Sequence, residues 1–116
     1  MNLFHWLTGH FTNRGKALSV YKRGMVRAKK HDHQGAIDDY TTAIFVHDTP
    51  ADVKAMALYN RALVYAATEE GPKATEDLKM LLAMDQARVN VKAMARQKLA
   101  RMETRSRKSN LEIPGV

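Results

Sequence analysis

Apolar positions along this chain recur at steps of three and four residues. Leu58, Ala62 and Tyr65 follow this spacing, and Leu78 and Leu81 continue it later in the chain. Such spacing places apolar residues on one side of a helix, and no stretch shows the two-residue period of a strand with one exposed face. Turn-forming residues separate the periodic segments. The pattern predicts five helices, at about residues 17–30, 35–47, 53–67, 72–84 and 89–103.

The two ends of the chain differ from this periodic region. Residues 1–15 carry large apolar residues close together, from Leu3 to Phe11, which predicts an N-terminal amphipathic arm or short helix. From residue 104 onward the apolar period is lost, so residues 104–116 are predicted to form a basic flexible tail. One domain, residues 16–103, lies between these ends, as a length of 116 residues suggests.

An internal repeat organises this domain. Two helix–turn–helix units, at about residues 17–50 and 53–86, align with a constant offset of 38 residues. Small residues at equivalent positions let the two helices of each unit approach closely where they cross. The offset pairs Val20 with Leu58, Tyr21 with Tyr59, Arg23 with Arg61, Gly24 with Ala62, Ala36 with Ala74, and Asp39 with Asp77.

The second unit, ALYNRALVYAATEEGPKATEDLKMLLAMD, resembles a tetratricopeptide repeat. The first unit resembles it too, although Val20 and Arg27 stand where that family prefers a large residue and an aromatic one. The residues that match the family are Gly24, Ala36, Tyr40 and Ala43 in the first unit and Ala62, Tyr65, Ala74 and Leu78 in the second. The resemblance implies an all-α fold of tetratricopeptide-type helical hairpins in a right-handed superhelical stack. The helix at about 89–103 would close this stack as a cap.

The resemblance also implies a concave groove lined by the first helix of each hairpin. Carried over by register, the peptide-binding residues are Tyr21, Lys22, Met25, Lys29, Tyr59, Asn60, Leu63, Lys92 and Arg96. A basic groove with tyrosine and methionine contacts would favour an acidic or extended peptide. The alternative is that these charges only solvate exposed helix faces. The carboxylate clamp of some family members matches only in part. Asn60, Lys92 and Arg96 fit its second and third repeats, but Tyr21 and Met25 stand where its first repeat has lysine and asparagine.

The formal net charge of +7 is unevenly distributed. Residues 14–30 carry seven basic and no acidic residues, residues 31–85 four basic and ten acidic, and residues 86–116 eight basic and two acidic. A uniform coat for nucleic acid would not alternate in this way. We therefore expect a non-catalytic protein–protein interaction module or small adaptor. A basic nucleic-acid- or ribosome-associated helical protein is the alternative.

No group of residues in the sequence points to catalysis, a metal or a cofactor. The sequence has no cysteine, no glycine-rich phosphate loop and no serine in a strand–turn–helix elbow. The acidic pairs at 38–39 and 76–77 fall early in predicted helices, where the helix dipole favours them. His31 and His33 lack further ligands nearby in the sequence. We expect no enzyme activity, no cofactor and no metal site.

The expected partner is another protein, bound through an acidic segment, and nucleic acid is the second choice. The N-terminal arm is expected to pack on its own domain, giving a monomer, or on a neighbouring copy, giving a homodimer. We do not expect it to contact a membrane. No apolar run reaches the roughly 18 residues of a membrane-spanning helix, and the first residues lack the basic segment of a secretory signal. A cytoplasmic location is therefore expected.

Overall fold

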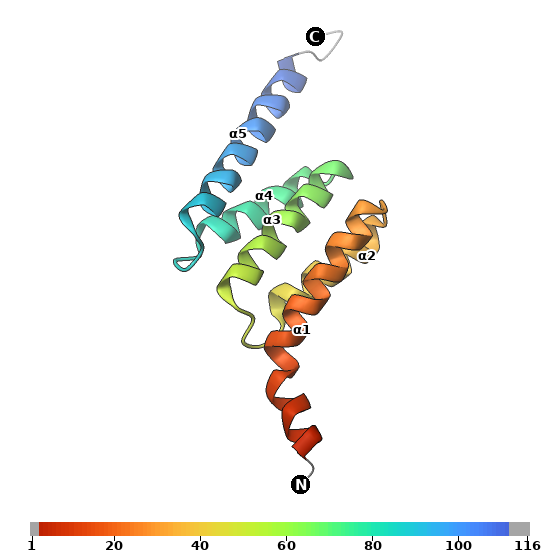
Figure 1. Ribbon diagram of the computed structural model, residues 1–116. Coiled ribbons are helices and arrows are strands. Elements are labelled where there is room, and N and C mark those ends of the chain that lie inside the picture. Colours follow the sequence, from red (N-terminus) through yellow and green to blue (C-terminus); the bar gives the residue numbers. More distant parts are fainter. Residues whose placement is uncertain (1–2, 112–116) are drawn as a thin grey trace.

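The computed structural model describes the backbone of residues 3–111 and the side chains of residues 14–111. Within residues 3–111 it contains five α-helices and no strand, which confirms the all-α class (Figure 1). The helices are α1 (Leu3–Lys29), α2 (His33–Phe45), α3 (Ala51–Ala67), α4 (Gly71–Leu82) and α5 (Val89–Leu111).

The three central helices lie close to their predicted places, but both outer helices are longer than predicted. Residues 3–15 are not a separate arm, because they form the beginning of α1. The prediction of a flexible tail from residue 104 is wrong as far as Leu111, since α5 continues to that residue. Residues 1–2 and 112–116 lie outside the described part, as do the side chains of residues 1–13, on which the predicted packing of the arm depends.

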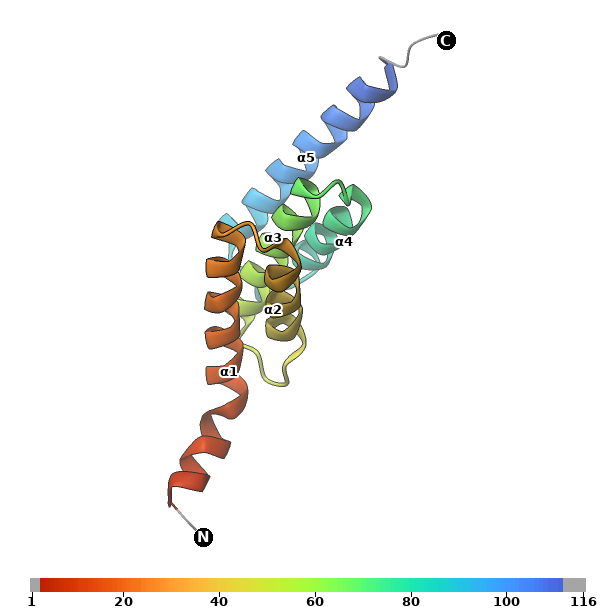
Figure 2. The same cartoon turned by 90° about the vertical axis from the view of Figure 1, so that its right-hand side faces the viewer.

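The helices pack as two antiparallel hairpins followed by a single helix. Helix α1 pairs with α2 and α3 pairs with α4, while α2 packs on α3 and α4 packs on α5. The molecule measures 72 × 30 × 17 Å, with a radius of gyration of 17.1 Å, against about 13 Å for a compact chain of this length. It is elongated because the start of α1 and the end of α5 project beyond the hairpins in opposite directions (Figures 1 and 2).

Equivalent turns end α1 and α3. In each turn a backbone N–H donates to the carbonyl five residues earlier, Asp32 to Arg27 at 2.9 Å and Glu70 to Tyr65 at 2.8 Å. This bond is characteristic of the Schellman motif, in which the residue after the C-cap is left-handed and usually glycine. Here that residue is His31 or Glu69, with φ of 60° and 62°. The turn geometry therefore repeats with the same offset of 38 residues.

The core shows a matched change of residue size between the two hairpins. A Cβ atom added to Gly24 would lie 2.8 Å from Cε1 of Tyr40, so only glycine lets α1 approach this buried ring without a shift. The equivalent residues in the second hairpin are Ala62 and Leu78, both fully buried. A smaller side chain on one helix thus accompanies a larger one on the other, which keeps the hairpin crossing filled in both units.

Candidate peptide-binding surface

Helices α1, α3 and α5 carry all nine residues predicted for the peptide-binding groove. Helix α3 contacts both α1 and α5, whereas α1 and α5 do not contact each other. In Figure 2, α2 and α4 lie on the side of the molecule away from α1. We call the face formed by these nine residues on α1, α3 and α5 the inner surface.

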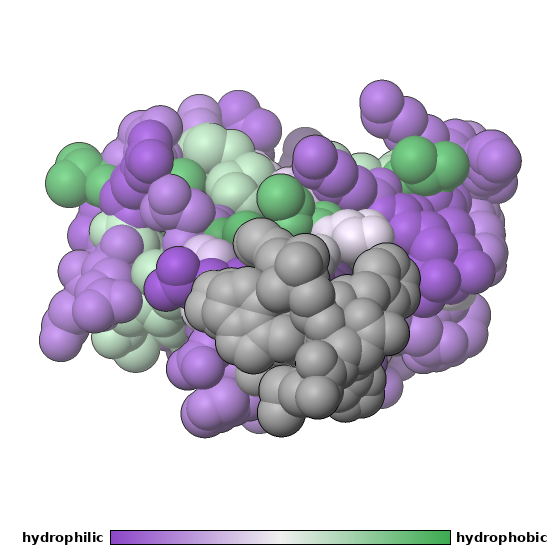
Figure 3. Space-filling model, turned by 60° about the horizontal axis from the view of Figure 1, so that its bottom comes forward, coloured by the Kyte–Doolittle hydropathy of each residue, from purple (hydrophilic) through white to green (hydrophobic). Residues whose placement is uncertain are grey.

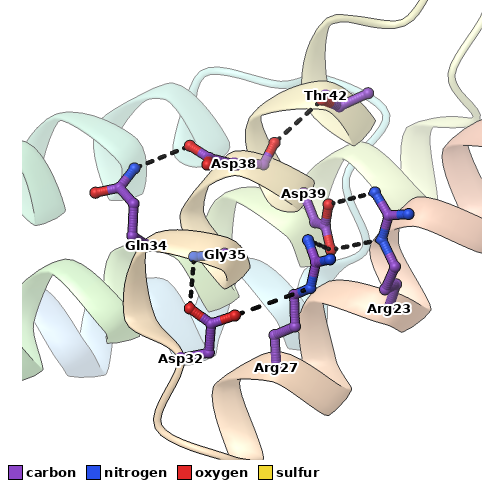
Figure 4. A network of polar contacts seen from close by, with 8 residues as sticks. All are labelled: Arg23, Arg27, Asp32, Gln34, Gly35, Asp38, Asp39 and Thr42. Carbon is purple, nitrogen blue, oxygen red and sulfur yellow. Dashed lines mark hydrogen bonds and ion pairs between the residues drawn. The ribbon is translucent and has the colours of Figure 1, made fainter.

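Each hairpin is tied together by an arginine–aspartate pair. Arg23 donates from Nε to Oδ2 of Asp39 at 3.0 Å and from Nη2 to Oδ1 at 2.8 Å (Figure 4). Arg61 makes the same two bonds to Asp77, at 2.8 Å and 2.6 Å. Arg27 adds a third bond to Asp39, from Nη1 at 3.1 Å. Two-pronged pairs of this kind are short and directional, so they fix how the two helices of each hairpin meet.

These pairs correct the interpretation of the acidic residues as partners of the helix dipole alone. Asp39 and Asp77 are buried, and each neutralises an arginine of the preceding helix. The hydrogen bond from Arg61 to Asp77 raises the pKa of Arg61, and burial opposes that rise. Asp39 likewise raises the pKa of Arg23. The sequence does hold the clue, because arginine and aspartate lie 16 residues apart in both units.

Tyr21 and Asn60, predicted for the groove from different units, are in direct contact. The side-chain amide of Asn60 donates a 2.9 Å hydrogen bond to the hydroxyl oxygen of Tyr21. Burial raises the pKa of Tyr21, and this hydrogen bond lowers it by a smaller amount. The ring of Tyr21 also lies against that of Tyr40, with the centroids 5.9 Å apart. Because the Tyr21 hydroxyl accepts the bond from Asn60, its own proton remains available for a carbonyl or carboxylate.

The basic residues of the inner surface differ from the hairpin arginines in having no acidic partner within residues 14–111. Lys22, Lys29 and Arg96 are exposed, and Lys92 is half-buried. The basic residues of α1 and α3 that do form ion pairs in the described structure are Arg23, Arg27 and Arg61, whose partners lie on α2, on α4 and in the turn before α2. Positive charge on the inner surface is therefore left without internal compensation.

The apolar members of the inner surface are half-buried. Met25 and Tyr59 pack against the core, and Leu63 lies one turn after Tyr59 on α3. Viewed toward the end from which α1 projects, the coloured surface is mostly hydrophilic, with apolar residues scattered over it (Figure 3). On the part of this face that is coloured, apolar residues therefore do not form one continuous patch.

An ion pair that the sequence did not predict joins the beginning of α3 to the residue before α5. Arg88 donates to Asp52 from Nη2 at 3.0 Å and from Nε at 3.3 Å. Both side chains are exposed, so the pair contributes little to stability. It borders a hollow between α3 and α5, also lined by Met56 and Val91. The pair therefore links the start of α3 to the segment before α5 at the rim of this hollow.

The described residues offer no constellation for a metal. Among them, no three His, Asp or Glu side chains gather closely enough to hold an ion. The rings of His31 and His33 lie 6.0 Å apart, while Asp32 accepts a hydrogen bond from the N–H of Gly35 and caps α2. Within the same part of the chain, no helix combines the length and the apolar character needed to cross a membrane.

Comparisons with known proteins do not supply a relative. No protein-family model, curated protein or solved structure matches the chain. A functional assignment therefore depends on the residues of the inner surface and on their geometry.

Proposed function

We propose that this chain is a tetratricopeptide-type module that binds an acidic, extended segment of another protein on its inner surface. One observation carries the proposal. The inner surface presents Lys22, Lys29, Lys92 and Arg96 without acidic partners in the described structure, whereas the arginines that face α2 and α4 are neutralised by buried aspartates. Unneutralised positive charge on a surface attracts a ligand of opposite charge and increases its rate of association.

The repeated construction of the hairpins supports the tetratricopeptide assignment. The two units share equivalent arginine–aspartate pairs, equivalent Schellman turns and small residues at the helix crossings. Repeat proteins of this class present the first helices of successive hairpins as one continuous binding face. Helix α5 extends that face and covers one side of α4, as a terminal capping helix would.

The surface suits a peptide that is both charged and partly apolar. Lysine and arginine would hold its carboxylates, and the hydroxyl proton of Tyr21 would donate to a main-chain carbonyl. Met25 and Leu63 would contact its apolar side chains. Binding of this kind needs neither a cofactor nor a catalytic group. The absence of cysteine from the sequence fits a reducing compartment, and we place the module in the cytoplasm.

Affinity purification with the tagged full chain, followed by mass spectrometry, tests the proposal. The informative variant is Lys22→Glu/Arg96→Glu, which reverses two charges on the inner surface. The matched control is Lys73→Glu/Lys79→Glu, which makes the same change in charge on exposed positions of α4. Circular dichroism first establishes that both variants remain helical.

We expect the wild type and the α4 variant to recover the same acidic partner, and the inner-surface variant to lose it. Loss of the partner in both variants would show that overall charge, rather than the inner surface, determines binding. Retention of the partner in both variants would refute the proposal.

A further inference from the structure

The last part of α5 is an exposed helix. After Met102, which packs against the core, every residue from 103 to 111 is exposed. These nine residues extend about 13 Å, and Figures 1 and 2 show this end of α5 pointing away from both hairpins. An isolated helix of this length is marginal in water without a partner. A ligand that binds along it would therefore stabilise it.

This part of α5 is strongly basic. Residues 96–108 include six lysines and arginines and a single acidic residue, Glu103. Glu103 approaches Arg107 at 3.9 Å, and no other ion pair involves this stretch within the described structure. Arg101 and Arg105 lie one helical turn apart, and Lys108 follows at the next turn. Like charges at this spacing repel each other, so a polyanion that lies along the helix would relieve the repulsion.

The side chains around these charges distinguish a polyanion from other partners. Gln97, Ala100 and Thr104 lie beside Arg101 and Arg105 on one face of the helix. This face has hydrogen-bond donors, and exposed Leu111 at the end of the helix is its one large aliphatic residue among the described residues. Protein interfaces depend on buried aromatic and apolar anchors, and a helix that lies on a membrane needs an apolar side to insert. Phosphate groups need only charge and hydrogen-bond donors.

We propose that residues 97–111 bind double-stranded DNA through its phosphate backbone, without dependence on base sequence. A single helix about 10–12 Å across matches the major groove of duplex DNA, which is about 12 Å wide. The end of α5 can approach such a groove because residues 103–111 are exposed and the helix points away from both hairpins, with only the start of α4 nearby, across a hollow that Glu103 and Ser106 line. This site is separate from the peptide contacts proposed for the inner surface.

The salt dependence of binding gives a quantitative test. The four exposed basic side chains of residues 97–111, Arg101, Arg105, Arg107 and Lys108, would each neutralise about one phosphate. The logarithm of the association constant should then fall with the logarithm of salt concentration with a slope of about −3.6. Affinity for a labelled 20-base-pair DNA duplex, followed by fluorescence anisotropy, should fall roughly 150-fold between 50 and 200 mM salt.

Two variants of equal charge separate this site from a general effect of net charge. Arg101→Gln/Arg105→Gln/Lys108→Gln should reduce the slope to about −0.9. Lys30→Gln/Lys73→Gln/Lys79→Gln removes the same charge elsewhere and should leave the slope unchanged. Glutamine has a high helix propensity, so both variants should keep the helix content of the wild type, which circular dichroism measures.

Three outcomes would overturn the proposal. They are an equal loss of DNA affinity in both variants, an unchanged slope in the α5 variant, and binding to phosphatidylserine vesicles with none to the DNA duplex. The α5 variant should still recover the protein partner of the inner surface. Failure of the duplex assay and failure of the pull-down can therefore be distinguished.

Discussion

Replacing Gly24 with alanine tests how closely α1 and α2 approach. The added Cβ would lie 2.8 Å from Cε1 and 2.9 Å from Cδ1 of Tyr40, and 3.2 Å from Cβ of Asp39. Carbon atoms in ordinary contact are about 3.5–4.0 Å apart, and the Tyr40 ring, 1% exposed, has no solvent space into which it could move. Such overpacking costs about 1–3 kcal/mol, while the better helix propensity of alanine returns about 1 kcal/mol.

The net expectation for Gly24→Ala is a loss of about 1 kcal/mol in the free energy of unfolding, or roughly 4 °C in Tm. Urea denaturation followed by circular dichroism measures it. Gly71→Ala is the control, because apart from its two chain neighbours and the backbone of its own helix no atom lies within 4 Å of the Cβ that it adds. That control should leave stability unchanged or slightly higher.

A double-mutant cycle assigns the loss to Tyr40 itself. Tyr40→Leu introduces the residue found at the equivalent position 78 of the second hairpin, where alanine is accommodated at position 62. On this background Gly24→Ala should no longer destabilise and should gain about 1 kcal/mol from helix propensity, a coupling of about 2 kcal/mol. If alanine costs the same on both backgrounds, the steric explanation is wrong.

Three further expectations concern the ion pairs, the turns and pH. Asp77→Ala should lower the free energy of unfolding by about 3–5 kcal/mol, because Arg61, 8% exposed, loses its partner. Removing the side chain of Arg23, which is 58% exposed, should cost far less. Equal losses of stability in urea denaturation would contradict this expectation. Glu69→Gly should raise the free energy of unfolding by about 1 kcal/mol, since glycine adopts positive φ without strain; a lower Tm would count against the Schellman turn. Burial, with smaller contributions from Tyr21 and Asp39, raises the pKa of Tyr40 from 10.0 to about 12, so its contribution to stability should be present below pH 10 and lost as the pH rises toward 12. Tyr40→Phe should remove this component from a pH series of unfolding curves, and the tyrosinate absorbance of that variant should lose the last of the tyrosine titrations.

Apolar periodicity identified the helices that are buried and missed the parts that are not. Residues 104–111 have no apolar period because nothing packs on them, yet they include Arg105, Arg107 and Lys108, which have high helix propensity. The start of α1 is a similar case, because the sequence pattern changes there while the helix continues. The apolar pattern therefore indicates which part of a helix is buried. The full length of the helix depends in addition on the helix propensity of its residues and on where a helix-ending residue occurs.

The sequence predicted which helices carry the candidate site residues, but it did not predict the ion pairs between the helices. The 38-residue offset placed Tyr21 and Asn60 on neighbouring helices, and they are in contact. The same offset aligned Arg23 with Arg61, but their aspartate partners were interpreted from helix position alone. An ion pair between helices depends on where the two helices cross and on side-chain reach, which a pattern along one helix does not contain.

Site-directed photocrosslinking in living cells tests the central claim most directly. A photoreactive phenylalanine analogue would replace Leu63 on the inner surface or, as a control, Met80 on α4, which is also partly exposed. The account predicts that position 63 crosslinks to an acidic segment of another protein, that position 80 does not, and that Lys22→Glu/Arg96→Glu abolishes the crosslink. Crosslinking of the partner from position 80 but not from position 63 would contradict it.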